Sequence, residues 1–130
     1  QIGFPGGFRE VEDRDLLRTA LREAMEEIGT PAEQFEVLGR LEPVHTHKKE
    51  VLVYPWVVTM KLPFPFELNP GEVEKLVFLP LKRLMTEGLH PIEVAIEGFT
   101  VKSKGLWVDG ELLWGASARM LEQLLVHFSL

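Results

Sequence analysis

Residues 15–28 of this 130-residue chain have the pattern of a helix with two different faces. At about 100° per residue, Glu23, Glu26 and Glu27 share one arc, because residues three and four positions apart are neighbours on a helix surface. A second arc is apolar and consists of Leu17, Ala20, Leu21, Ala24 and Ile28. We therefore predict a helix that packs on a core through one face and presents three carboxylates on the other.

Three carboxylates on one helix face have a plain interpretation as well as a functional one. Most Glu-rich helix faces are solvated and carry one or two ion pairs, which here would join Arg22 to Glu26. The string R-E-x-x-E-E-x-G is more specific than that, because average residue usage produces it by chance in about one in ten thousand chains of this length. Hard divalent cations prefer oxygen ligands, so the string favours a metal-binding face.

The string resembles part of the box of the Nudix hydrolases, G-x5-E-x7-R-E-U-x-E-E-x-G-U, in which U is a bulky aliphatic residue. Gly7 stands at the first position and residues 22–29 at the second half. The acidic position after Gly7 is Asp13, in a loop one residue longer than usual. Two residues stand where bulky aliphatic residues are usual, Ala24 and Thr30. The coenzyme A diphosphatase branch of the family is closer, because residues 4–29 are similar to its F-P-G-G-x5-D-x8-R-E-x2-E-E-x-G pattern.

The resemblance to that branch continues beyond the box. Residues 69–73 and 78–81 look like its N-P-x-E-V and hydrophobic-P-L segments, and residues 113–121 are similar to its I-W-G-x-T-A-x-I-L segment. Of the branch's upstream signature, associated with coenzyme A recognition, only the last part is present, at residues 3–7. We therefore expect further N-terminal sequence, with one or more strands, before Gln1.

The resemblance implies both a fold and a reaction. The fold would be α/β, a Nudix α/β/α sandwich with a mixed β-sheet flanked by helices, in one domain over residues 1–130. The reaction would be hydrolysis of a diphosphate linkage with Mg²⁺ or Mn²⁺ as cofactor. Coenzyme A or a derivative, cleaved to 3′,5′-ADP and 4′-phosphopantetheine, is the leading substrate. The alternatives are ADP-ribose, a dinucleotide or another nucleoside diphosphate derivative, a Nudix module that binds a nucleotide without cleaving it, and an acidic domain with no ligand.

The resemblance also implies roles for the box residues. Glu26 and Glu27 would bind the metal directly, and the Gly6 carbonyl is a further candidate ligand, because a glycine loop allows close backbone approach. Glu23 would either bind another metal or take the proton from the attacking water, and the sequence leaves the choice of base open. Arg22 is expected to orient the carboxylates by pairing with one of them; the alternative is a simple surface ion pair.

Several residues outside the box are weaker candidates. Glu72 would either face the site from a loop or be a solvated acid in a turn. His45 and His47 would share one side of an extended segment, where they could contact a phosphate or an ion, or simply be solvated. Lys48 and Lys49 could attract an anionic substrate, with a solvated pair of charges as the alternative.

The composition excludes several classes of protein. A formal net charge of -6 argues against a nonspecific nucleic-acid binder, and an acidic enzyme for an anionic substrate needs metal to bridge the repulsion. The chain has no cysteine, which excludes a disulfide scaffold and a thiolate metal site. No apolar run approaches the length of a membrane span and no signal peptide is visible, so the expected location is the cytoplasm, away from the membrane. Nudix domains often pair, which leaves a homodimer open.

Secondary structure can be predicted along most of the chain. Helices are predicted over residues 15–28, 81–86 and 116–128, and strands over residues 35–41, 51–62, 73–79, 99–101 and 105–113. Asp15 is suited to cap the first helix and Gly29 to end it, while Asp13 and Asp15 shape the preceding loop. Residues 51–58 are apolar on both faces, as in a central strand, although Pro55 argues against a regular one. Asp109 and Gly110 are the turn signal of a hairpin.

Overall fold

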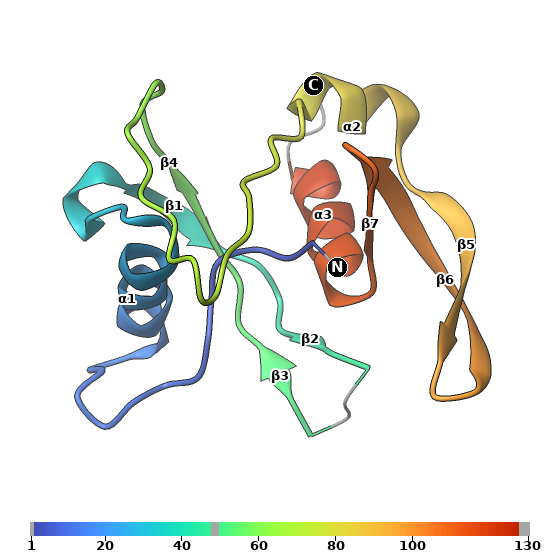
Figure 1. Ribbon diagram of the computed structural model, residues 1–130, viewed down its shortest axis with the longest axis horizontal. Helices are drawn as coiled ribbons and strands as arrows, with labels where there is room; N and C mark the ends of the chain where they lie inside the picture. Colours follow the sequence, from blue (N-terminus) through green and yellow to red (C-terminus); the bar gives the residue numbers. More distant parts are fainter. Residues whose placement is uncertain (1, 48–49, 128–130) are drawn as a thin grey trace. The chain divides into compact units, whose positions relative to one another are not determined.

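The computed structural model describes residues 2–47 and 50–127, and the chain divides into two compact units (Figure 1). The first, which we call the C-terminal unit, consists of Gln1–Gly3, Leu41–Pro55 and Val77–Leu130. The second, which we call the box unit, consists of Phe4–Arg40 and Trp56–Leu76. The single domain over residues 1–130 stays a prediction.

The box unit is built around helix α1, Leu16–Ile28, and a two-stranded antiparallel sheet. The sheet pairs β1, Glu36–Arg40, with β4, Trp56–Thr59, and the short 3₁₀ helix η1, Ala32–Gln34, lies between α1 and β1 in the chain. Three apolar residues of the predicted packing face of α1 are buried, namely Leu21, Ala24 and Ile28. The predicted helix and its apolar face are confirmed.

Both ends of α1 have the caps that the sequence predicts. The Asp15 carboxylate accepts a hydrogen bond from the backbone N–H of Arg18 at 2.8 Å, which satisfies one of the N–H groups left free in the first turn. At the other end, Gly29 has φ 70°, a left-handed conformation in which its N–H reaches the Met25 carbonyl.

An extended segment is bonded to the C-terminal end of α1. The N–H of Glu67 donates to the carbonyl of Ile28, and the N–H of Asn69 donates to the carbonyl of Glu27, each at 3.0 Å. A Cβ atom at Gly29 would lie 2.9 Å from the Cβ of Glu67, so only glycine fits this approach without a shift. The segment thus occupies two carbonyls that a helix end leaves without partners.

The C-terminal unit contains the remaining elements. Its strands are β2, Val44–His45; β3, Leu52–Val53; β5, His90–Ile96; β6, Phe99–Val108; and β7, Glu111–Trp114. Its helices are α2, Leu81–Glu87, and α3, Ala116–His127. Strand β2 pairs with β3, and a three-stranded sheet has the order β5-β6-β7. Within residues 2–47 and 50–127, no helix is both long and apolar enough to cross a membrane.

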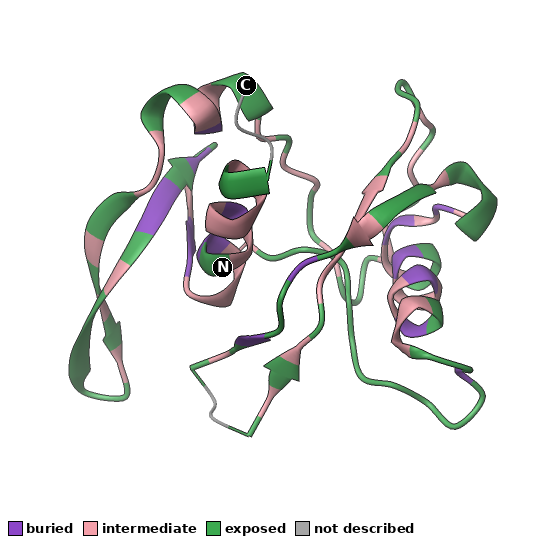
Figure 2. Ribbon diagram, turned by 180° about the vertical axis from the view of Figure 1, so that it is seen from behind, coloured by how far each residue is buried: buried purple, intermediate pink, exposed green. Residues whose placement is uncertain are grey.

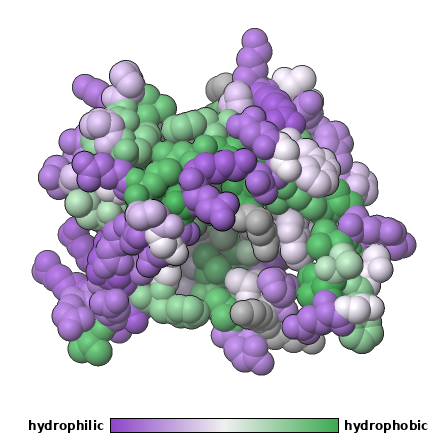
Figure 3. Space-filling model, in the orientation of Figure 1, coloured by the Kyte–Doolittle hydropathy of each residue, from purple (hydrophilic) through white to green (hydrophobic). Residues whose placement is uncertain are grey.

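The core of the C-terminal unit lies between its larger sheet and its helices. Its buried side chains come from α2, β6, β7 and α3 and are Leu84, Leu106, Val108, Leu113, Ala118 and Leu121. Figure 2 shows these elements with buried residues in purple. Other apolar side chains remain exposed, including Phe99 at 76% and Trp107 at 60%, and the face of the molecule in Figure 3 carries apolar side chains beside hydrophilic ones.

Several predicted elements of this unit are confirmed and one hairpin is new. Helix α2 matches the prediction, and α3 ends at His127, with Phe128 outside the described residues. Asp109 and Gly110, with φ 49° and 80°, form the predicted turn between β6 and β7. Strand β5 was not predicted, and β6 is longer than expected, because Glu97 and Gly98, with φ 48° and 83°, make a second hairpin turn.

Two strand predictions are wrong, and the bounds of a third are wrong, because residues 99–108 form one strand, β6, and the turn at Asp109 and Gly110 separates it from β7. Residues 51–58 do not form one central strand, because β3 ends before Tyr54 and β4 starts after Pro55, and each strand pairs with a different neighbour. Proline cannot donate to a ladder, and Leu52 and Tyr54 are 39% and 44% exposed. Residues 73–79 belong to none of the described sheets, since a β-prone segment forms a strand only where another strand's edge receives it.

The fold class agrees with the predicted α/β type, with helices and sheets in the same chain. All strand pairs among the described residues are antiparallel. A mixed sheet requires at least one parallel strand pair, and the described residues contain none.

Candidate active site

The Arg22 side chain contacts two of the three predicted carboxylates. Its Nη1 atom lies 3.0 Å from Oε1 of Glu23 and 3.2 Å from Oε2 of Glu26. One guanidinium nitrogen thus links two carboxylates on the same face of α1. The predicted pairing is present, and it engages two of the three predicted carboxylates where one was expected.

The other edge of the Arg22 guanidinium is bound by Asp13. Nε and Nη2 of Arg22 donate to the Asp13 carboxylate at 3.1 and 3.0 Å, and Nη2 also donates to the Phe8 carbonyl at 3.0 Å. Asp13 is only 6% exposed. The hydrogen bond from Arg22 is the main cause that holds the pKa of Asp13 well below its usual range, and the bond to Asp13 raises the pKa of Arg22. The side chains of Asp13 and Arg22 are therefore both ionised at neutral pH.

The sequence interpretation gave Asp13 a role in loop shape and missed it as the partner of Arg22. The available signal was its place at the first acidic position of the box. A charge that is nearly buried needs an opposite charge or several hydrogen bonds, but a sequence does not show which loop residue becomes buried.

Glu27 is held separately from the other two carboxylates. Its Oε1 atom accepts a hydrogen bond from the Gly6 N–H at 2.8 Å. Burial raises the pKa of Glu27, the nearby charges of Glu23, Glu72 and Glu26 raise it further, and the bond from Gly6 opposes the rise. Negative charge is thus in excess around Glu27, and a bound cation would relieve it.

Glu72 lies on a turn that is tied to the backbone of Glu27. The N–H of Asn69 donates to the Glu27 carbonyl, and the Asn69 carbonyl accepts from the N–H of Glu72 at 3.0 Å. The Asn69 side chain accepts from the Gly71 N–H at 3.1 Å, a turn in which asparagine is favoured. The structure therefore brings Glu72 near Glu27, while its role in the chemistry stays a prediction.

Comparison with known proteins identifies the family. The model of the NUDIX domain matches residues 1–97. This chain belongs to the Nudix family. The uncharacterized Nudix hydrolase NudL of Photorhabdus laumondii is 33% identical over 125 residues, which are 95% of this chain and 66% of that protein. Proteins of the same name from Yersinia pestis and Yersinia pseudotuberculosis are 33% identical over 131 residues, 100% of this chain and 65% of theirs. The chain thus spans just under two thirds of these relatives.

The carboxylates of Glu23, Glu26 and Glu27 are chemically suited to bind a divalent metal ion. All are hard oxygen donors of the kind that Mg²⁺ and Mn²⁺ bind, and burial, together with the nearby charges of Glu23, Glu72 and Glu26, raises the pKa of Glu27. In the part of the chain that the structure describes, no three acidic or histidine side chains are arranged closely enough to form a metal site. Arg22 binds Glu23 and Glu26 while Gly6 binds Glu27, so each carboxylate already has a protein donor.

Gly7 of the Nudix box leaves the space that the Glu23 carboxylate fills. A Cβ at Gly7 would lie 2.5 Å from both Cδ and Oε1 of Glu23. Gly7→Ala is therefore expected to displace Glu23 and to lower metal-dependent hydrolysis by about 10–100-fold, the usual effect of disturbing groups that orient ligands. The measurement is the rate at increasing Mg²⁺ concentration. Gly3→Ala is the matched control, since its nearest atom would be 4.0 Å away; equal activity of Gly7→Ala and wild type would contradict the prediction.

The two predicted histidines belong to the C-terminal unit. His45 lies in β2 and its carbonyl accepts a hydrogen bond from Arg119. The His47 ring stacks on Trp114 with centroids 5.9 Å apart. Their contact with a substrate stays a prediction, and Lys48 and Lys49 lie outside the described residues.

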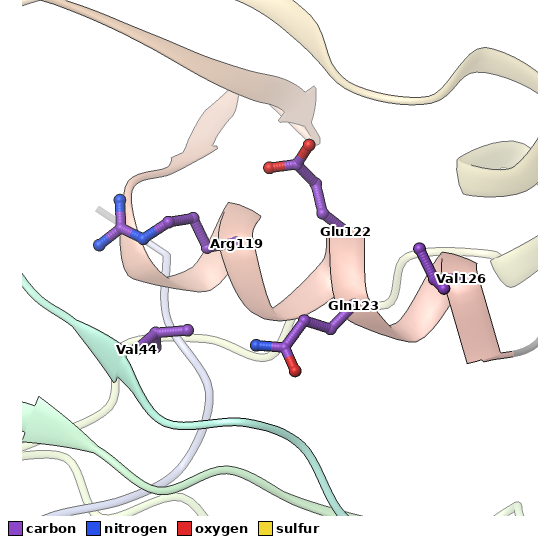
Figure 4. A pocket seen from close by; sticks show the side chains of 5 residues that line it. All are labelled: Val44, Arg119, Glu122, Gln123 and Val126. Atoms are coloured by element: carbon purple, nitrogen blue, oxygen red, sulfur yellow. The ribbon is translucent and has the colours of Figure 1, made fainter.

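An open pocket in the C-terminal unit has none of the predicted site residues in its lining. Its volume is about 360 Å³, and it is lined by Val44, Arg119, Glu122, Gln123 and Val126. Figure 4 shows Val44 on β2 and the other four side chains on α3. Glu122 is engaged by Lys104 at 3.2 Å, and Gln123 is bonded to the backbone of Glu42. The lining polar groups are thus used within the fold.

Proposed function

We propose that this protein hydrolyses a diphosphate linkage in a nucleotide-containing small molecule, with a divalent metal ion as cofactor. The observation that carries the proposal is that one nitrogen of Arg22, Nη1, contacts both Glu23 and Glu26 on one face of α1. Such a contact orients carboxylates without removing their charge. The Nudix hydrolase names of the relatives agree with this reaction.

The proposed roles follow the predicted site. Glu26, Glu27 and the Gly6 carbonyl would hold Mg²⁺ or Mn²⁺, which when bound neutralises phosphate oxygens and acidifies water. Glu23 would bind a further ion or accept the proton from the attacking water. Arg22 keeps the carboxylates in place. Glu72 would assist from its turn, beside Glu27.

Coenzyme A is the leading substrate, on the strength of the resemblance at residues 4–29 and 69–73. ADP-ribose or a dinucleotide is the alternative substrate, and a nucleotide-binding module without catalysis is the alternative function. A contact of His45 and His47 with the substrate remains a prediction, with solvated side chains as the alternative. A cytoplasmic location, a homodimer and no binding of nucleic acid or membranes remain predictions.

Product analysis of the full-length protein tests the proposal. The protein is incubated with Mg²⁺ or Mn²⁺ and coenzyme A, ADP-ribose or a dinucleotide, beside the double variant Glu26→Gln/Glu27→Gln. Glu33→Gln, an exposed glutamate in η1, is the matched control and should behave as wild type. Wild type should form 3′,5′-ADP from coenzyme A, and the double variant should not. This result would support both the proposed reaction and coenzyme A as its substrate.

Other outcomes separate the alternatives. Cleavage of ADP-ribose or the dinucleotide alone would retain the reaction and reject coenzyme A. Saturable nucleotide binding without any cleavage would favour a binding module, and the absence of saturable divalent-ion binding would favour an acidic domain with no ligand.

A further inference from the structure

Thr19 is a buried polar residue on α1, and it has none of the roles proposed for the residues of the Nudix box. It is 3% exposed, and its Oγ1 atom lies 3.0 Å from Oδ2 of Asp13 and 3.3 Å from the Asp15 carbonyl. A hydroxyl has one proton to donate, and an ionised carboxylate at the shorter distance is the stronger acceptor. The Thr19 hydroxyl therefore donates to Asp13.

Asp13 is fixed from several directions. Oδ2 accepts from Thr19 and from the N–H of Glu10 at 2.9 Å, and the Asp13 N–H donates to the Glu10 carbonyl at 3.0 Å. Arg9 also donates to the Asp13 carbonyl at 2.8 Å. The loop and the helix thus both hold this residue, and from the helix the Asp13 carboxylate is bound by the Thr19 hydroxyl and by Arg22.

The orientation of Asp13 determines where the guanidinium of Arg22 lies. Asp13 binds Nε and Nη2 of Arg22, which directs Nη1 toward Glu23 and Glu26. Since a guanidinium is planar and rigid, fixing one of its edges fixes the other. A displacement of Thr19 would therefore shift Asp13 and Arg22. Through Arg22 it would also shift the carboxylates of Glu23 and Glu26.

We propose that Thr19 is a positioning residue for the carboxylates of the site, acting through Asp13 and Arg22 without touching metal or substrate. This inference rests on the proposed function, since Glu23 and Glu26 are the groups that it positions. The opposing interpretation is that Thr19 only satisfies a buried loop and matters for stability alone.

Thr19→Val separates these interpretations, because valine is also β-branched and of similar size but has no hydroxyl. Mn²⁺ affinity of the full-length protein, measured by electron paramagnetic resonance of free Mn²⁺ well below the unfolding temperature, should fall about 10-fold. Thr19→Ser should restore it. Should Thr19→Val not fold, Thr19→Ala removes the same hydroxyl.

Thr30→Val is the matched control. Thr30 is 0% exposed in the same unit, and its hydroxyl has no hydrogen-bond partner among the described residues. Its replacement should leave Mn²⁺ affinity unchanged. A double variant adds a second check: Thr19→Val combined with Arg22→Ala should bind Mn²⁺ no more weakly than Arg22→Ala alone, because coupled residues are not additive.

The inference would be overturned by wild-type Mn²⁺ affinity in Thr19→Val, by additive effects in the double variant, or by the absence of saturable Mn²⁺ binding in wild type. The proposed function fails separately. If wild type binds Mn²⁺ but cleaves no diphosphate, the reaction is wrong while the affinities still decide the role of Thr19.

Discussion

Glu27→Gln is expected to lower metal-dependent hydrolysis by about 10³-fold, which corresponds to about 4 kcal/mol of transition-state stabilisation. Glutamine keeps the shape of the side chain and can still accept the hydrogen bond from Gly6, but it lacks the charge that would hold a divalent cation. The measurement is kcat with saturating substrate at several Mg²⁺ concentrations. The exposed Glu33→Gln is the control, and activity within a few-fold of wild type in Glu27→Gln would contradict the proposed role.

The same variant is expected to gain stability relative to wild type when metal is absent. Glu27 has a raised pKa in the folded state, so the folded protein holds its proton more tightly than the unfolded chain does. Stability is therefore lost as pH rises from the ordinary glutamate range through the raised pKa. Glutamine does not titrate, so the variant lacks this loss.

The measurement is the unfolding temperature in EDTA between acidic and neutral pH. The advantage of Glu27→Gln should grow with rising pH and level off above the raised pKa of Glu27. Added Mg²⁺ should reduce or reverse it, because a ligand stabilises the folded form that binds it. An advantage that does not change with pH would show that burial and neighbouring charge do not act on Glu27 in this way.

Arg22→Lys is expected to lower activity by about 10–100-fold although the charge is retained. Lysine offers one nitrogen, whereas Arg22 binds Asp13 with one edge and Glu23 and Glu26 with the other. The measurements are kcat, KM and Mn²⁺ affinity. Arg83→Lys is the matched control, because Arg83 pairs with Glu87 on α2 of the C-terminal unit at 2.7 Å.

Arg22→Lys should also reduce stability at neutral pH. The lowered pKa of Asp13 contributes stability above its ordinary range, and this contribution is lost as pH falls toward the lowered value. The difference in stability between wild type and Arg22→Lys should therefore be largest near neutral pH and smaller in acid. Full activity and full stability in Arg22→Lys would show that charge alone suffices.

The elements that the sequence determined by itself are those with local causes. Helix α1, its Asp15 cap and its Gly29 end follow from bonds between residues at most four positions apart. The turn at Asp109 and Gly110 likewise needs only residues with access to positive φ. The box string also placed Glu23, Glu26 and Glu27 on one helix, because helix geometry brings such positions together.

The tertiary structure decided the features that depend on residues far apart in the chain. Asp13 became the partner of Arg22 because the loop folded back and buried its carboxylate. Residues 67–69 reached the end of α1, and residues 73–79 formed no described strand. The physical reason is that an ion pair, a helix-end contact or a strand ladder needs a second group at the right distance, and local sequence does not specify where that group will lie.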